Sequence, residues 1–244
     1  MAKKRGKDEE KLNYSAAVRE LKADGPERLY LLWGPEDYLR EQYLAQLKKI
    51  CLPEGEDDFS YKRMDGPGLD PTRLREALDA IPFMSERSFV ELRNVDINKL
   101  ANADDCMKLL EDIPDYCTVA FVQSAQFEPD GRLKFVKALR GEAKELKFTQ
   151  QSQGMLTDWI VRRFAAAGKS IELDAAQRLI FISGDLMSRL IPEIDKIAAY
   201  AKGERVTVKD VDAVASHIPE AVIFEMTELI SQKKYNSAMS VLAE

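Results

Sequence analysis

Up to residue 149, the chain alternates between two patterns of apolar positions. Short runs rich in β-branched and aromatic residues, bounded by turn residues, predict strands. These runs are Leu29–Trp33, Phe59–Met64, Ser88–Arg93, Cys117–Val122 and Glu145–Phe148. Between them, apolar residues recur every three or four positions, which predicts helices at Leu12–Leu21, Leu39–Leu47, Asp70–Ile81, Asp104–Ile113 and Arg132–Leu139. Asp37 and Asp70 are expected to cap the second and third of these helices. Because strands alternate with helices, we predict a three-layer α/β domain with a parallel sheet.

From Gln150 onward the pattern is almost entirely helical. Helical faces run through 159–167, 174–182, 190–201 and 208–215, and two further helices are predicted at Val222–Ile230 and Tyr235–Leu242. Asp174 is expected to cap the second of these helices, Pro192 fits poorly inside the third, and Pro219 breaks the chain before the fifth. We therefore predict a domain boundary at 149/150, and we expect the last helical pair to be cut short at Glu244.

The composition suits a folded protein with a substantial core, because 45% of the 244 residues are apolar and 32% are charged. The net charge of −6 argues against a protein whose main surface binds duplex DNA. Three separated basic runs are expected to be solvated unless they converge in the fold: Lys3–Arg5, Lys48–Lys49 and Arg162–Arg163. No apolar run approaches the ~20 residues of a transmembrane helix. Residues 1–11 predict a disordered basic tail rather than a signal peptide.

Cysteine and histidine are too sparse to predict a metal or catalytic site. Cys51, Cys106 and Cys117 are widely spaced, which indicates reduced thiols, and Cys117 is expected to be buried in a strand. His217 is the single histidine, so neither a histidine metal site nor a histidine-dependent triad is expected. We predict no metal and no cofactor.

One stretch, Leu29–Arg40, has the layout of a phosphate-binding P-loop: a buried strand, a glycine turn and a helix N-terminus. The residues that do the chemistry of such a loop are absent here, because Gly34 is followed by Pro35, Glu36 and Asp37 rather than by a second glycine, a lysine and a hydroxyl residue. Proline removes an N–H donor, and two carboxylates would repel a triphosphate. These residues therefore predict a degenerate nucleotide site, or else an ordinary turn of an unrelated doubly wound domain.

A second stretch, Ile81–Arg87, lies between a predicted helix and a predicted strand and carries the adjacent apolar residues Phe83 and Met84. Two neighbouring side chains in an irregular turn do not easily both point into the core. Either one of them packs under the sheet and the other is incidental, or the pair is exposed and fills a pocket on a partner.

In its order of elements, the chain resembles the delta subunit family of the bacterial DNA polymerase III clamp loader, an inactive branch of the AAA+ clamp-loader fold. The segments that carry the resemblance are Tyr30–Leu39, Ile81–Arg87, Gly184–Ile197 and Ile223–Ile230. The resemblance implies an AAA+-like (RecA-type) α/β domain at 12–149, a helical lid at 150–217 and the beginning of a helical collar domain at 218–244.

The resemblance also implies a mechanical function. In that family an apolar pair inserts into the hydrophobic pocket of the sliding clamp, and here the pair is Phe83 and Met84, flanked by Pro82, Ser85 and Arg87. Methionine at the second place departs from the family pattern, although its flexible side chain suits irregular pockets.

Several partners follow from the resemblance, all as expectations. The subunit would open the clamp or trap the open ring without hydrolysing ATP, beside motor and delta-prime type subunits in a hetero-pentamer. It would reach primer–template DNA through the assembled complex, in the cytoplasm at the replisome, and belong to the DNA polymerase III holoenzyme without a catalytic site of its own.

A different class of function competes with this interpretation: an active P-loop NTPase or nucleotide-binding enzyme with a helical lid. The nearest candidate for a magnesium-binding acid is Asp96 in Asn94–Asp96, and Arg189 is the nearest candidate for an arginine of the lid. A single acid and an arginine with no triphosphate to contact both favour surface roles.

Overall fold

The computed structural model describes residues 13–53, 55, 60–82 and 85–243. The predicted tail, Phe59 and the pair Phe83 and Met84 lie outside the described residues. The chain forms two compact units, which meet in the sequence between Thr149 and Gln150. Each unit is built from its own local patterns and is described separately below.

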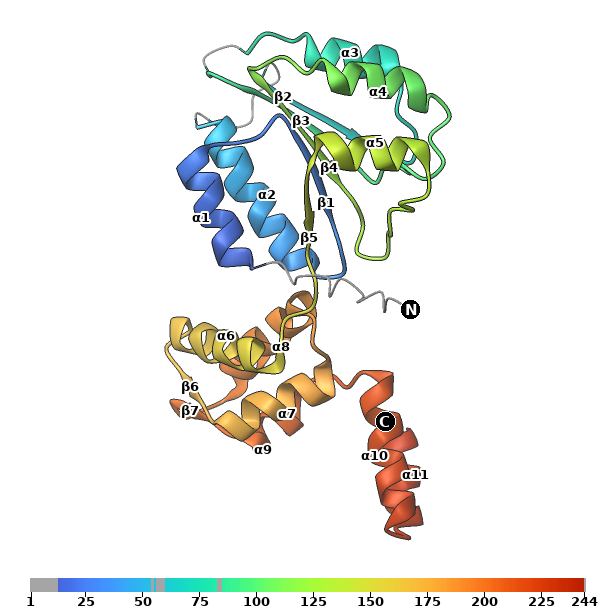
Figure 1. The fold of residues 1–244 in the computed structure, drawn as a ribbon. Helices are drawn as coiled ribbons and strands as arrows, with labels where there is room; N and C mark the ends of the chain where they lie inside the picture. The colour runs from blue at the N-terminus through green and yellow to red at the C-terminus, as the bar shows by residue number, and fades with distance from the viewer. Residues whose placement is uncertain (1–12, 54, 56–59, 83–84, 244) are drawn as a thin grey trace, which may run out of the picture. The chain divides into compact units, whose positions relative to one another are not determined.

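The first unit contains a five-stranded sheet in the order β2-β3-β4-β1-β5, in which all pairings are parallel (Figure 1). The strands are β1 Leu29–Trp33, β2 Tyr61–Asp65, β3 Ser88–Arg93, β4 Cys117–Val122 and β5 Lys144–Lys147. The sequence prediction of a parallel sheet is confirmed. The bounds of β1, β3 and β4 agree with the predicted ones, whereas β5 begins and ends one residue earlier than predicted.

Helices cover both faces of this sheet (Figure 1). On one face lie α1 Tyr14–Asp24 and α2 Asp37–Cys51, and on the other lie α3 Pro71–Leu78, α4 Ala103–Glu111 and α5 Lys134–Glu142. Successive side chains of a strand point to opposite faces, so the middle strands are apolar on both sides. Along β1, Leu31 packs in the core under α3, α4 and α5, while Tyr30 contacts Tyr43 of α2. Fully burying each such side chain contributes about 1.5–3 kcal/mol, which holds the three layers together.

Local signals explain where two of these helices begin. Asp70 caps α3, since its carboxylate accepts the N–H of Thr72 at 2.9 Å, as predicted from the sequence. By contrast, Asp37 is the first residue of α2 and Glu36 occupies the capping position, so the prediction that Asp37 caps this helix is wrong. Asp37 still lies in the first turn, where a negative charge is favourable beside the helix dipole.

The second unit is helical with one exception. Its helices are α6 Gln153–Ala166, α7 Leu173–Ser183, α8 Met187–Tyr200 and α9 Val208–Val214. Two-residue strands, β6 Ser170–Ile171 and β7 Arg205–Val206, form a parallel pair that the sequence did not predict. Glu172 takes the capping position of α7, which corrects the prediction for Asp174, and α8 runs through Pro192, which lies inside that helix.

The unit ends in a helical hairpin, α10 Pro219–Ser231 and α11 Tyr235–Ala243. Pro219 begins α10 instead of breaking the chain before it, because proline suits the first turn of a helix. Arg178 on α7 forms ion pairs with Asp212 at 2.7 Å and with Glu225 of α10 at 2.6 Å, and these fix the start of the hairpin. Among the described residues, no helix is long and apolar enough to cross a membrane.

Candidate functional site

The turn after β1, where a P-loop would hold phosphate, is filled by the chain itself. Gly34 has a φ of 119°, and a Cβ atom there would lie 2.4 Å from the carbonyl oxygen of Phe148. The N–H of Phe148 donates to the carbonyl of Trp33 at 2.7 Å. The backbone that follows β5 therefore packs directly against the glycine, and only glycine fits.

The main-chain N–H groups of this turn are already engaged. Pro35 has none, the N–H of Glu36 donates to the carbonyl of Phe148 at 3.0 Å, and that of Asp37 to the carbonyl of Pro35 at 3.1 Å. The buried guanidinium of Arg40 donates to the carbonyl of Gly34 at 2.9 Å and so faces the protein rather than solvent. A phosphate group in this turn would meet no N–H from residues 35–37, all of which the structure describes.

The two candidates for an NTPase, Asp96 and Arg189, lie in different units. Asp96 accepts the N–H of Asn98 at 3.2 Å, which is a turn contact, and Arg189 is exposed on the other unit. Within the described parts of the chain, no group of three or more histidine, cysteine or acidic residues could hold a metal ion. Cys51, Cys106 and Cys117 are free and buried, and Cys117 lies in β4 as predicted.

The loop before β3 lies at the opposite edge of the sheet, because β1 ends at one edge and the parallel strand β3 begins at the other (Figure 1). Ile81 opens the loop and is 77% exposed, which is high for so large an apolar side chain. Pro82, Ser85 and Arg87 are half-buried, and the predicted pair Phe83 and Met84 lies outside the described residues. The helical spacing of Ile81 predicts a buried position on the helix that follows Asp70, but that helix ends at Leu78 and leaves Ile81 in the loop.

The exit of this loop is held by polar contacts. Ser85 Oγ lies 2.8 Å from Ser60 Oγ and 2.9 Å from the carbonyl oxygen of Arg87. The Arg87 guanidinium donates to the carbonyl of Asp115 at 3.2 Å, and the N–H of Ser88 donates to the carbonyl of Tyr116 at 2.8 Å. Ser60 was not among the predicted site residues, since nothing in its local pattern indicates a partner so far along the chain.

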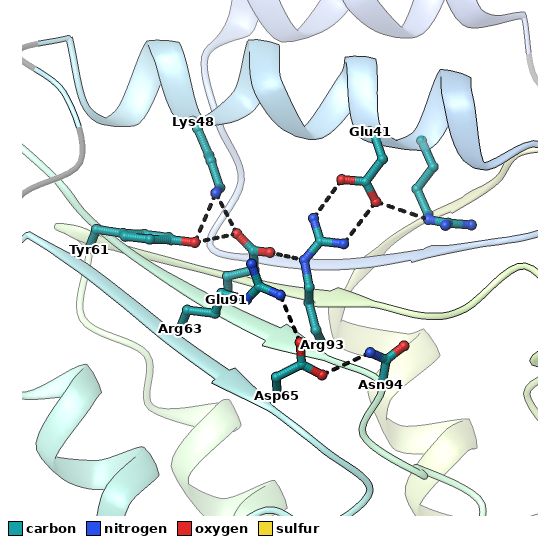
Figure 2. A network of polar contacts seen from close by, with 9 residues as sticks. Glu41, Lys48, Tyr61, Arg63, Asp65, Glu91, Arg93 and Asn94 are labelled. Atoms are coloured by element: carbon teal, nitrogen blue, oxygen red, sulfur yellow. Dashed lines mark hydrogen bonds and ion pairs between the residues drawn. The ribbon is translucent and has the colours of Figure 1, made fainter. Parts of the chain in front are cut away.

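A buried polar network joins β3 to α2 (Figure 2). Glu91 in β3 is fully buried, and its carboxylate lies 2.6 Å from Lys48 Nζ and accepts the Tyr61 hydroxyl at 2.8 Å. Arg93 contacts the other oxygen of Glu91 and donates to both carboxylate oxygens of Glu41, at 2.9 Å and 2.5 Å. Figure 2 shows that Lys48 and Glu41 reach from the helix toward these two strand residues.

This network keeps Glu91 ionised inside the protein. Burial raises the pKa of Glu91, but hydrogen bonds from Lys48, Arg93 and Tyr61 outweigh burial, so its pKa lies below the ordinary value of 4.5. The hydrogen bonds that Arg93 donates to Glu41 in turn raise the pKa of Arg93. Every charge in the network has an opposite charge beside it, which is the condition under which buried charges are tolerated.

Two of the three basic runs, Lys48–Lys49 and Arg162–Arg163, lie within the described residues, one in each unit. Lys48 is engaged with Glu91 and Tyr61, and Lys3–Arg5 lies outside the described residues. Arg163 lies on the other unit, 3.9 Å from Asp195, with its guanidinium over the ring of Trp159. Lys48 departs from the expectation of a solvated basic run, because its side chain is largely buried against Glu91.

A parallel sheet in this order, a glycine turn in place of a P-loop and a helical unit after the sheet define a protein of the AAA+ type. Residues 30–149 match the family model described as DNA polymerase III, delta subunit. The chain is 26% identical over 225 residues to DNA polymerase III subunit delta of Bacillus subtilis, which covers 87% of this chain and 64% of that protein. These matches, together with the fold, support the identification of the chain with the DNA polymerase III delta subunits, to which it is similar over most of its length.

Other similarities agree with this family. The chain is 25% identical to the probable DNA polymerase III subunit delta of Aquifex aeolicus, over 88% of this chain and 63% of that protein. It thus spans less than two thirds of the length of both curated relatives. The solved Bacillus subtilis DNA clamp loader delta protein matches with a TM-score of 0.62 at 20% identity, over 94% of this chain and 70% of that one.

The fold is also similar to that of a motor protein. The Thermotoga maritima RuvB Holliday junction branch migration motor matches with a TM-score of 0.57 at 16% identity, over 94% of this chain and 79% of that one. At such identity the likeness concerns the fold alone.

Proposed function

We propose that this chain is a clamp-loader subunit that binds the sliding clamp through the loop 81–87 and favours the open ring. The observation that carries the proposal is the loop itself: a large apolar side chain, Ile81, is exposed where the loop begins, and Phe83 and Met84 follow in the sequence. An exposed apolar side chain followed in the sequence by two more apolar residues in a loop suits a contact with a partner. The similarity to the delta family supports the sliding clamp as that partner.

Phe83 and Met84 are the proposed anchors, and Pro82, Ser85 and Arg87 are proposed to shape and orient the loop. Each buried anchor contributes about 1.5–3 kcal/mol before the costs of ordering the loop. Binding shifts the clamp toward the open ring only to the extent that the loop has a higher affinity for the open form. The work is therefore done by differential binding, and the subunit needs no ATP of its own.

Further parts of the proposal rest on the family resemblance. The unit before Gln150 serves as the AAA+-like domain, 150–217 as the lid and 218–244 as the start of the collar. The partners are motor and delta-prime type subunits in a hetero-pentamer, with primer–template DNA contacted through the assembled complex. In this arrangement Gly34, Pro35, Glu36 and Asp37 form a nucleotide site that has lost its function.

The experiment measures binding of the chain to the sliding clamp of its own organism by calorimetry or surface plasmon resonance. The variant is Phe83→Ala/Met84→Ala, and we expect it to bind about 100-fold more weakly, since two apolar anchors are lost. Circular dichroism melts must show that its stability equals that of the unchanged chain.

A matched control is Phe224→Ala/Met239→Ala, which removes the same two residue types from exposed positions on the helical hairpin. This control should bind the clamp with unchanged affinity. If both double variants lose equal affinity, or neither does, the contact lies elsewhere and the proposal is wrong.

A further inference from the structure

We propose that Ser60, directly before β2, is a positioning residue for clamp binding, because its hydrogen bond to Ser85 holds the exit of the loop 81–87. This inference rests on the proposed function and adds a residue that never touches the clamp. It concerns how firmly the loop is presented, rather than which side chains enter the partner.

The first support is the chemistry of the two hydroxyl groups. Ser85 Oγ lies 2.9 Å from the carbonyl oxygen of Arg87, and a carbonyl can only accept. A hydroxyl has a single proton, so Ser85 donates it to that carbonyl and accepts the proton of Ser60 at 2.8 Å. The Ser60 side chain is buried, with 1% of the residue exposed, so this hydrogen bond is shielded from competition by water.

The second support is that the exit of the loop is tied to the strands on both sides of β3. Ser60 precedes β2, and its carbonyl accepts the N–H of Phe89 at 2.7 Å in the first rung between β2 and β3. On the other side, Arg87 donates to the carbonyl of Asp115 and Ser88 to that of Tyr116, just before β4. Residues 85–88 thus bridge the starts of three neighbouring strands.

The third support is that Ser60 is itself held from the helix layer. The next residue, Tyr61, has its ring stacked near Phe89 with centroids 6.5 Å apart, and its hydroxyl accepts from Lys48 of α2 at 2.9 Å. Because Lys48 also pairs with the buried Glu91, the start of β2 cannot shift without disturbing this network. Ser60 therefore offers the loop a fixed point.

A fixed loop exit lowers the cost of binding. When a loop is already held near its bound conformation, less conformational freedom is lost on association, and affinity rises with no added contact. Removing one shielded hydrogen bond of this kind should weaken clamp binding about three- to tenfold.

The test compares Ser60→Ala, Ser85→Ala and the double variant, each measured for clamp affinity and for its urea unfolding midpoint. We expect each single variant to bind about three- to tenfold more weakly, and the double variant to bind no more weakly than the worse single variant, since all three lack the same hydrogen bond. Ser85→Thr keeps the hydroxyl and should restore the affinity. Ser124→Ala, an exposed serine beyond the far end of β4, is the control and should change nothing.

The outcomes separate this inference from the function on which it rests. If Phe83→Ala/Met84→Ala loses clamp binding while Ser60→Ala and Ser85→Ala keep full affinity, the positioning role is wrong and the proposed function stands. Additive losses in the double variant, or no rescue by Ser85→Thr, also overturn it. Undiminished binding by Phe83→Ala/Met84→Ala overturns both proposals.

Discussion

The carboxyl end and the amino end of the parallel sheet differ in how the chain covers them. At the carboxyl end of β1, the turn 34–37 is filled by the backbone at Phe148 and by Arg40, and its N–H groups are bonded within the protein. At the amino end of β3, the loop 81–87 begins with an apolar side chain that is 77% exposed. Ligands of open α/β sheets usually bind at the carboxyl ends of strands, so the fold alone points to the turn 34–37 and not to the loop that we propose as the contact.

This difference teaches that a fold can keep the layout of a strand, a glycine turn and a helix while the chain itself fills the place of a ligand. The turn after β1 retains its glycine, but the residue now permits a close approach of the chain to itself rather than of a phosphate to the backbone. The opposite edge has the features of a protein contact.

The largest effect is expected from Gly34→Ala, in the turn 34–37. The new methyl group would collide with the Phe148 backbone at 2.4 Å, and the φ of 119° is unfavourable for any other residue. Together these should lower the free energy of unfolding by about 3–4 kcal/mol, measured by urea denaturation.

The control for that variant is Gly25→Ala. Gly25 also has a positive φ, 81°, but a Cβ there would have nothing within 4 Å. We expect a loss of about 1–2 kcal/mol from backbone strain alone. Equal losses of unfolding free energy in the two variants would mean that the Phe148 backbone does not pack closely against residue 34.

The polar network around Glu91 should give the next largest effect. Glu91→Ala leaves Lys48 and Arg93 without their shared carboxylate, and since both side chains are partly exposed we expect a loss of about 2–3 kcal/mol in unfolding free energy. Because the pKa of Glu91 is lowered in the folded protein, its contribution to stability is present above 4.5, the ordinary value. That contribution is lost as the pH falls through the lower, folded-state pKa.

Glu91→Gln, which keeps the shape and removes the charge, makes this pH dependence measurable. Its stability deficit relative to the unchanged chain should be constant from neutral pH down to about 4.5 and should shrink below that value. A deficit that is the same at every pH would show that Glu91 acts through its shape and not through its ionised carboxylate.

These regions differ in how much of them the sequence predicted. The strands β3 and β4 and the cap at Asp70 follow from local patterns, and they were predicted at the observed residues. The network around Glu91 was missed because its members come from α2, β2 and β3, and only the fold brings them together. The acidic residue within an otherwise apolar strand was the one available signal.

Two further misses have physical causes. The pair of β6 and β7 is two residues long in each strand, which is too short to produce a periodic pattern. The close approach of Phe148 to Gly34 joins residues far apart in the chain, so the sequence indicated only that phosphate chemistry was missing, not what fills the space. The role of Phe83 and Met84 stays a prediction.

A smaller effect is expected from Ile81→Ser, at the start of the loop 81–87. Since this side chain is largely exposed, the unfolding free energy should change by less than about 0.5 kcal/mol. If the clamp covers the start of the loop, however, binding should weaken about fivefold because apolar area is no longer buried there. Unchanged clamp affinity would limit the contact to residues after Ile81.

The smallest expected effect is none at all, from adding ATP and magnesium. A ligand at about 100 times its Kd stabilises a protein by about 2.7 kcal/mol, which would raise the melting temperature of a chain of this size by about 5–10 °C. We expect no shift at ~5 mM ATP, because the N–H groups that would hold the phosphates are bonded to Phe148 and Pro35. A P-loop ATPase run alongside shows that the assay detects binding. A shift that saturates with ATP would mean that the turn opens, since phosphate can enter only when the Phe148 backbone moves away from Gly34. The difference between the turn 34–37 and the loop 81–87 would then be one of conformation rather than of chemistry.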